Sequence, residues 1–175
     1  MTTSNVTIKF TRDEFHENPV TGEEWPGLNF YYGHRRYDLG GFKLNVAEEF
    51  DEVMDDAHAD GDWVFKMYMY DHSGCTVSLN EFSCQWDSGM VGFVIISAKD
   101  YPSEEDARKY AESFTSTLDS WLQNDIWMFG IEDADGEPID TCGGFIGDDI
   151  QTNGMLEYIP EEYRELAIAE WENRE

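Results

Sequence analysis

Side chains that could carry out acid–base or nucleophilic chemistry gather in the middle of this chain. A nucleophile, a general base and an orienting carboxylate could all come from one set, which comprises His34, Asp71, His72, Cys84 and Asp87 together with the hydroxyls of Ser73 and Ser88. Group transfer by such a set requires a thiolate or hydroxyl beside an imidazole that a carboxylate orients. The spacing does not impose that arrangement, because Asp and Ser in Gly-rich turns commonly bond the neighbouring backbone, and a buried Cys commonly fills apolar space. A small enzyme using this set is therefore the alternative hypothesis, and the preferred one assigns no catalytic residue.

Metal and cofactor binding are not expected. The four histidines and three cysteines contain no C-x-x-C or H-x-x-x-H pair. The acidic loop 133–137 does not fit a calcium-binding EF-hand, because position 12 of that frame would be Cys142. Gly143 and Gly144 are not followed by the Gly-Lys-Ser/Thr of a phosphate loop. With no secretory signal at the start of the sequence, we expect the cysteines to be reduced thiols.

Acidic residues are concentrated in two segments. The 175 residues include 38 Asp plus Glu against 11 Lys plus Arg, a net charge of -27. Residues 45–62 hold eight acids and no Lys or Arg, and residues 100–175 hold 21 acids against four basic residues. Residues 1–44 and 63–99 each have a net charge of -1. At one charge per ~1.7 Å of duplex DNA, this total corresponds to roughly 46 Å of duplex, comparable with the diameter of a globule of this length.

Clustered carboxylates can imitate a phosphate backbone, because Lys and Arg in a basic groove attract either group by charge. The expected partner is therefore the basic DNA-binding groove of another protein. The preferred contacts are Glu48, Glu49, Asp51, Glu52, Asp55 and Asp56, followed by Glu161, Glu162, Glu165 and Glu172. Direct binding to nucleic acid or to an anionic membrane is not expected, because like charges repel. Adaptation to a salt-rich cytosol would also select many acids and few lysines, although 15% aromatic residues and a near-neutral centre argue against it.

Periodicity predicts a single α+β domain over residues 1–175, with one mostly antiparallel sheet of five to seven strands and about three flanking amphipathic helices. The strands are expected at residues 6–10, 28–32, 63–70, 75–82, 90–97, 125–132 and 139–146. A first helix follows Asn45 as its N-cap, with Glu48 three residues on, and ends at Gly61. A second opens at Pro102-Ser103, with Ser103 and Asp106 as a capping pair, and a last one has Pro160 in its first turn. No apolar run approaches the ~18 residues that cross a bilayer.

Turns should present the candidate catalytic residues. Residues 71–74 and 85–89 read as turns between strands, and residues 133–137 read as a hairpin loop. The segment 33–41 is also rich in turn residues and contains Arg35 and Arg36. We expect this arginine pair to bond internal carboxylates and so hold the 33–41 turn in place.

About half of the chain resembles a family through several combined motifs. They are His34-Arg35-Arg36-Tyr37-Asp38-Leu39-Gly40, Tyr68-Met69-Tyr70-Asp71-His72-Ser73-Gly74 and Phe82-Ser83-Cys84-Gln85-Trp86-Asp87-Ser88-Gly89-Met90-Val91-Gly92, with a weaker one at Cys142-Gly143-Gly144-Phe145-Ile146-Gly147. Similar strings occur in uncharacterised proteins of bacteriophages, prophages and other mobile elements. The resemblance implies expression from such an element in a prokaryotic cytosol, and it transfers no catalytic residue.

Together these observations predict an anti-defence protein of a phage or mobile element. It would act as an acidic DNA mimic that binds and blocks a host restriction or CRISPR component, without a cofactor, in the cytoplasm of the host. The alternatives are the small enzyme described above and an acidic accessory protein of a phage or a halophile. A homodimer through a strand edge or aromatic surface stays open.

Overall fold

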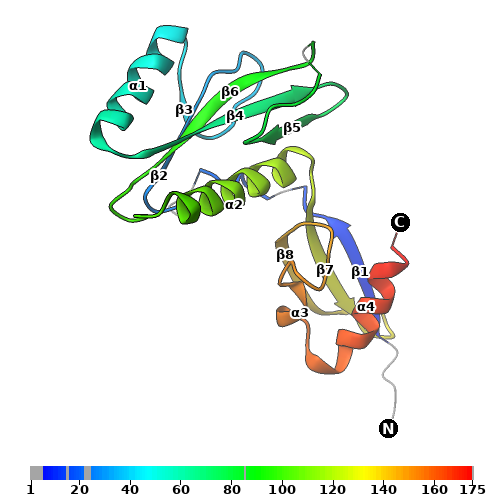
Figure 1. Cartoon of the computed structure of the whole chain (residues 1–175). Helices are drawn as coiled ribbons and strands as arrows, with labels where there is room; N and C mark the ends of the chain where they lie inside the picture. The colour runs from blue at the N-terminus through cyan, green and yellow to red at the C-terminus, as the bar shows by residue number, and fades with distance from the viewer. Residues whose placement is uncertain (1–5, 15, 22–24, 85, 175) are drawn as a thin grey trace. The chain divides into compact units, whose positions relative to one another are not determined.

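The computed structural model describes residues 6–14, 16–21, 25–84 and 86–174, and the chain forms two compact units (Figure 1). The central unit comprises residues 18–123, and the N/C unit combines residues 1–17 with residues 124–175. The α+β class, the mostly antiparallel pairing and the flanking helices are confirmed. The expectation of one domain over residues 1–175 stays a prediction, because contacts within two units do not measure whether they unfold together.

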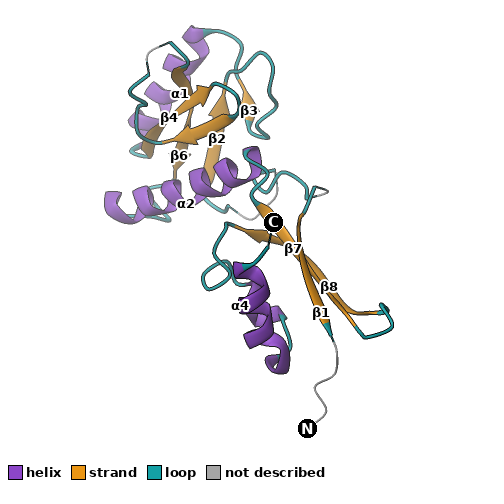
Figure 2. Cartoon of the chain, turned by 90° about the vertical axis from the view of Figure 1, so that its right-hand side faces the viewer, coloured by secondary structure: helices purple, strands orange, loops and turns teal. Residues whose placement is uncertain are grey.

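The central unit is a five-stranded sheet between two long helices. The strands are β2 (Leu28–Tyr32), β3 (Phe42–Lys43), β4 (Trp63–Asp71), β5 (Cys75–Ser78) and β6 (Ser88–Ile96), in the order β3-β2-β6-β4-β5. All neighbours are antiparallel except β2 and β3. The helices are α1 (Ala47–Asp60) and α2 (Glu104–Leu122), which lie on opposite faces of the sheet in Figures 1 and 2.

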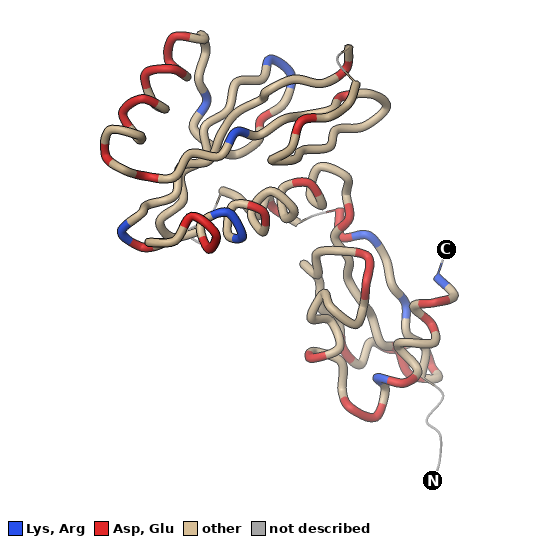
Figure 3. The backbone as a smooth tube through the Cα atoms, viewed as in Figure 1, with Lys and Arg blue, Asp and Glu red and all other residues tan. Residues whose placement is uncertain are grey.

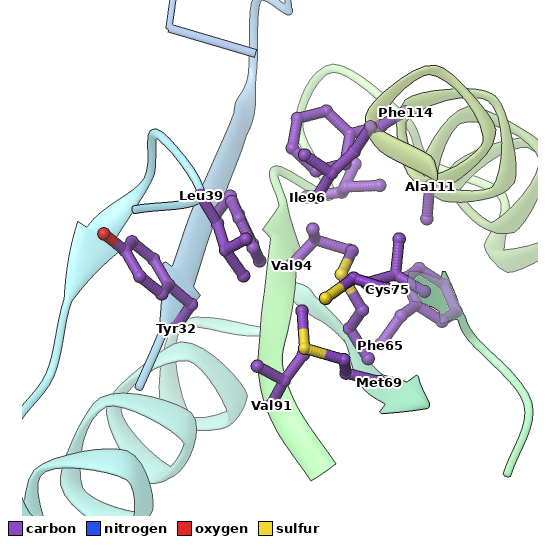
Figure 4. Packing of buried hydrophobic residues seen from close by; sticks show 14 of the residues in the cluster. Tyr32, Leu39, Phe65, Met69, Cys75, Val91, Val94, Ile96, Ala111 and Phe114 are labelled. Carbon is purple, nitrogen blue, oxygen red and sulfur yellow. The ribbon is translucent and has the colours of Figure 1, made fainter. Parts of the chain in front are cut away.

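Strand β6 is buried on both faces because each helix covers one of them. Phe93 and Ile95 pack with the apolar side of α1, whereas Val94 and Ile96 belong to the cluster that includes Phe114 of α2. Figure 4 shows the second cluster, in which Phe114 and Ala111 lie above the strand residues. The central strand thus reads as a continuous apolar run, as expected for a strand with both faces covered.

The predicted capping pair of α2 is confirmed. The backbone N–H of Asp106 donates to Ser103 Oγ at 3.4 Å, and the helix then buries Ala107, Ala111, Phe114 and Leu118 at helical spacing. The N-cap expected for α1 is wrong by one residue. Helix α1 begins after Val46, so Glu49 rather than Glu48 reaches back, and Glu49 Oε2 accepts from Asn45 N at 2.7 Å.

The N/C unit has its own three-stranded antiparallel sheet, in the order β1-β7-β8. Its elements are β1 (Thr7–Arg12), β7 (Ile126–Glu132), β8 (Pro138–Ile146), α3 (Met155–Tyr158), the short 3₁₀ helix η1 (Glu161–Tyr163) and α4 (Arg164–Glu172). Trp171 and Ala167 of α4 join Trp127, Phe129 and Ile131 of β7 in one core. The 133–137 hairpin is confirmed, with Asp133 Oδ1 accepting from the N–H groups of residues 135 and 137 at 2.9 Å.

Several expected details differ from the structure. The strands form two sheets instead of one, because alternation along the chain identifies a strand but not its pairing partner. Strand β5 ends at Ser78 instead of residue 82, and β3 and α3 were not expected. The last helix begins at Arg164, after η1, with Pro160 just before that turn. Gln85 of the expected 85–89 turn lies outside the described residues.

Candidate functional site

Helix α1 carries an acidic face that is continuous along its length (Figure 3). We define this face by Glu48, Glu49, Asp51, Glu52, Asp55, Asp56 and Asp60. Glu49 is half-buried and the other six are exposed. At ~100° per residue the seven carboxylates occupy about half of the helix circumference. The opposite half packs Phe50, Val53, Met54 and Ala57 against the sheet. The apolar side therefore fixes which way the acids point.

The charge density of this face is close to that of nucleic acid. The twelve steps from Glu48 to Asp60 span about 18 Å at ~1.5 Å per residue, which is about one charge per 2.6 Å. One DNA strand carries a charge per ~3.4 Å and the duplex one per ~1.7 Å. Among the described residues, no ion pair joins a Lys or Arg to any of these seven carboxylates.

Concentrating the acids in this way is electrostatically unfavourable for α1. Glu48–Glu52, Glu52–Asp56, Asp56–Asp60 and Asp51–Asp55 are like-charge pairs at i,i+4 spacing, each destabilising a helix by about 0.2–0.5 kcal/mol. Acids in the last turn also oppose the helix dipole. The helix is held by its apolar contacts and by Gly61 at φ 82°, where Asp62 N donates to Ala57 O at 2.9 Å.

The second predicted acidic set lies in the N/C unit. Glu161 and Glu162 are in η1, Glu165 and Glu172 are in α4, and all four are exposed. The two arginines of this segment, Arg164 and Arg174, contact groups other than these four carboxylates. Arg164 Nε donates to Ile159 O at 2.9 Å, and the Arg174 guanidinium lies 3.7 Å from the Trp171 ring centroid and pairs with Asp148. The two acidic sets thus belong to different units.

The near-neutral centre contains a hollow of about 340 Å³, and it collects part of the predicted catalytic set. His34, Asp71, Asp87 and Ser88 line it, together with Trp86, Met69, Met90 and backbone of the 33 and 89 glycines. His72 and Cys84 do not line the hollow, but both contact Asp87, which does. The indole of Trp86 is 95% exposed, although sequence reasoning did not single it out. An aromatic residue among turn formers was the available signal.

His34 has a structural role in the 33–41 turn. Its Nδ1 accepts from Tyr37 N at 3.1 Å and from Arg36 N at 3.3 Å, and its ring stacks on Tyr37 at 4.7 Å. Burial lowers the pKa of His34, with further lowering by Arg36 and Lys43 and an opposing effect of Asp71. The neutral imidazole then carries its proton on Nε2. Because Nδ1 is occupied, His34 can donate but has no free nitrogen to act as a base.

The expected role of the arginine pair is met by Arg36. Its guanidinium forms an ion pair with Asp71, and the Tyr37 hydroxyl donates to the same carboxylate at 3.4 Å. Asp38 closes the other end of the turn, where it accepts from Gly40 N at 3.0 Å and from the Tyr32 hydroxyl at 2.8 Å. These two hydrogen bonds lower the pKa of Asp38.

Asp87 stands between the candidate nucleophile and the candidate base. Its Oδ2 lies 3.3 Å from His72 Nδ1 and 3.8 Å from Cys84 Sγ, while the Ser88 hydroxyl donates to Cys84 O. A thiol-based enzyme needs the imidazole between thiol and carboxylate. In the described residues no imidazole bonds the Cys84 thiol, so the structure assembles these groups in an order that does not activate it. Among all the described residues, no group of three or more His, Cys, Asp or Glu side chains is arranged to hold a metal ion.

Comparison with known proteins adds no relative. No protein-family model, no curated protein and no solved structure matches the chain. Among the described helices, none is both long enough and apolar enough to cross a membrane.

Proposed function

We propose that this protein is an anti-defence protein of a phage or mobile element, which acts in the prokaryotic cytosol as an acidic DNA mimic. The acidic face of α1 enters the basic DNA-binding groove of a host restriction or CRISPR component and blocks it stoichiometrically. The observation that carries the proposal is the one-sided cluster of seven carboxylates on α1, none of which pairs with a Lys or Arg of the described residues, although their i,i+4 repulsions destabilise the helix. Local unfavourable choices of this kind are expected where function requires them.

Two other features support a binding role. The charge per length of the acidic face falls between those of one DNA strand and of the duplex. The face is also rigidly oriented, since Phe50 and Val53 on its opposite side pack into the cluster around Phe93. A preoriented surface loses little conformational freedom on binding.

The direct experiment is inhibition of purified DNA-cutting enzymes. A Type I restriction enzyme and a Cas9–guide complex would each be titrated with the protein, and DNA cleavage and DNA binding would be followed. The proposal predicts inhibition near 1:1 stoichiometry that excess duplex DNA competes away and that weakens steeply with salt. An unchanged cleavage rate by both enzymes at low salt would refute it for these two classes.

A charge-matched pair of variants separates mimicry from general acidity. The first variant combines Glu48→Gln, Asp51→Asn, Glu52→Gln and Asp55→Asn. The second combines Glu104→Gln, Glu112→Gln, Asp135→Asn and Glu157→Gln at exposed sites elsewhere. Both change the net charge from -27 to -23. We expect the first to raise the inhibition constant at least tenfold, about 1.4 kcal/mol, and the second to change it no more than about threefold. Equal losses would indicate that only the total charge matters.

Salt adaptation and an accessory role predict different behaviour. A halophilic protein needs molar salt to fold, whereas the mimic folds at low salt. An accessory protein whose charge serves solubility would fold equally well at low salt, and it would inhibit neither enzyme.

A further inference from the structure

Three exposed apolar side chains of the central unit line two neighbouring hollows. The large hydrophobic residues exposed in the described part of this unit are Phe42, Val46, Trp86 and Met90. Trp86 and Met90 line the first hollow, and Val46 lines a second hollow of about 410 Å³. Phe42 is separate from these two hollows, since it lines a third one with Trp25 and Phe114 and stacks on Tyr31 at 5.1 Å.

The two hollows are neighbours. Both are lined by Gly33 and His34, and the second extends from this point to Ala47 and Phe50 of helix α1. The two hollows therefore form one mixed patch that runs from Trp86, across the 33–34 turn, to the start of the helix that carries the acidic face. Its exposed apolar side chains are Trp86, Met90 and Val46, and they stand among polar and charged residues. An exposed aromatic residue beside a hollow is typical of the residues that anchor protein interfaces.

We propose that this patch is an aromatic-binding docking face, and that its occupant is a basic segment of a partner protein that inserts an aromatic side chain beside Trp86. The inference deepens the proposed function, on which the identity of the partner as a DNA-interacting protein rests. Trp86 would add apolar contact to a complex in which the acidic face supplies the electrostatic attraction.

The lining of the first hollow fits an uncharged aromatic ring. Burial lowers the pKa of His34 and so favours its neutral form. Of the two carboxylates in the lining, Asp71 pairs with Arg36 and Asp87 lies 3.3 Å from His72 Nδ1. Met69 and Met90 offer polarisable thioethers, which make favourable contacts with aromatic rings. A volume of about 340 Å³ is at the small end of ligand pockets, which run from ~300 to ~1,000 Å³.

Charge complementarity places the basic part of the partner over α1. Arg35 and Lys43 line the second hollow and repel cations there, whereas the acidic face of α1 attracts them. The two parts of the contact should therefore be separable. The acidic face controls salt-sensitive association, and Trp86 controls how long the complex lasts.

Two synthetic peptides test the docking face without knowledge of the natural partner. One alternates Arg with Trp over eight residues, and the other alternates Arg with Ser, so that both carry the same charge. Binding to the full-length protein would be measured by fluorescence anisotropy. We expect the wild type to bind the Arg–Trp peptide at least tenfold more tightly than the Arg–Ser peptide.

Three variants locate this preference. Trp86→Ala should weaken binding of the Arg–Trp peptide about fivefold, the size of one aromatic contact, and leave Arg–Ser binding unchanged. Gly89→Val should act in the same way, because a Cβ at Gly89 meets no heavy atom within 4 Å and the added side chain takes up open space. Tyr158→Ala is the matched control, since Tyr158 is also an exposed aromatic residue, 62% accessible, in the N/C unit.

Equal wild-type affinity for the two peptides would overturn the proposal. So would an intact preference for the Arg–Trp peptide in both Trp86→Ala and Gly89→Val, or its loss in Tyr158→Ala alone. Trp86 is almost fully exposed, so its replacement does not threaten folding. If the peptide preference maps to Trp86 while neither DNA-cutting enzyme is inhibited, the docking face stands and the DNA-mimic function fails.

Discussion

His34 is held in the 33–41 turn by two hydrogen bonds that only the unprotonated Nδ1 can accept. Its lowered pKa means that the folded state favours neutral imidazole more than the unfolded state does. The contribution of His34 to stability is therefore complete above pH ~6.5, the unfolded pKa, and is lost as pH falls from there towards the lower folded pKa.

The first prediction concerns this pH dependence. His34→Asn supplies an amide oxygen that can accept the same backbone N–H groups but does not titrate. We expect the variant to lose less stability than the wild type between pH 7.5 and pH 5.5, measured by urea unfolding with tryptophan fluorescence. An unchanged slope in His34→Asn would contradict the assigned role.

Cys84 and His72 test the enzyme alternative. Both contact Asp87 and neither contacts the other in the described structure. The second prediction is that Cys84→Ser and His72→Ala leave inhibition of a DNA-cutting enzyme within about twofold of the wild type, because binding through α1 needs no thiol chemistry. Complete loss of activity in either folded variant, checked by circular dichroism, would favour catalysis.

Arg174, near the end of the chain, contacts two tryptophans and an aspartate of the N/C unit. Its guanidinium lies 3.7 Å from the Trp171 ring centroid and 4.8 Å from that of Trp127, and it pairs with Asp148. The third prediction is that Arg174→Ala lowers the free energy of unfolding by about 1–2 kcal/mol, the range of a partly desolvated cation–π contact. Arg174→Lys should recover only part of this, because an ammonium cannot stack as a planar guanidinium does. Equal stability of all three proteins in urea unfolding would refute the contact.

Single residues also show the limits of reading the sequence alone. The arginine pair was expected to hold the 33–41 turn through carboxylates, and Arg36 does so with Asp71, 35 residues away. The order of Cys84, Asp87 and His72 in space could not be predicted, since it depends on how two turns approach one another. The sequence places Trp86 among turn-forming residues, but it does not show that this residue is 95% exposed or that it borders a hollow.

At the scale of elements, helix α1 and its acidic side could be predicted from the sequence, whereas the pairing of the strands could not. Apolar spacing identified the helix and its acidic side, and Gly61 marked its end. The pairing of strands was beyond the sequence, because β1 joins β7 across more than 100 residues and β3 has only two residues. Alternation of side chains carries no information about which strand lies next to which.

The fourth prediction follows from repulsion within α1. Asp56→Lys removes two like-charge pairs, with Glu52 and Asp60, and replaces them with attractive i,i+4 pairs. We expect the free energy of unfolding to rise by about 0.8–2 kcal/mol at low salt, while inhibition of a DNA-cutting enzyme weakens. Asp135→Lys, in an exposed hairpin, makes the same change of charge and should affect inhibition much less. A variant of α1 that is both more stable and a better inhibitor would contradict the account.

At the scale of the whole molecule, the charge is shared almost equally between the units. Residues 1–17 with 124–175 carry 18 acidic and 4 basic residues, net -14, and residues 18–123 carry 20 and 7, net -13. Counting along the sequence suggested two acidic segments flanking a neutral centre. Folding combines the near-neutral start of the chain with its acidic end, so segment charge did not predict unit charge. What distinguishes α1 is that residues 45–62 contain no Lys or Arg and that no described Lys or Arg pairs with its acidic face, not a larger total charge.

The most direct test of the central claim is the salt dependence of binding to an inhibited DNA-cutting enzyme. The dissociation constant would be measured from 50 to 200 mM salt for the wild type and for the two charge-matched variants, in α1 and elsewhere. We predict a steep dependence for the wild type and for the variant with substitutions elsewhere. The dependence should be clearly shallower for the α1 variant, because four carboxylates that form ion pairs with the enzyme in the proposed complex are neutral in it. Identical slopes for the two variants would show that the carboxylates of α1 are not the contact surface.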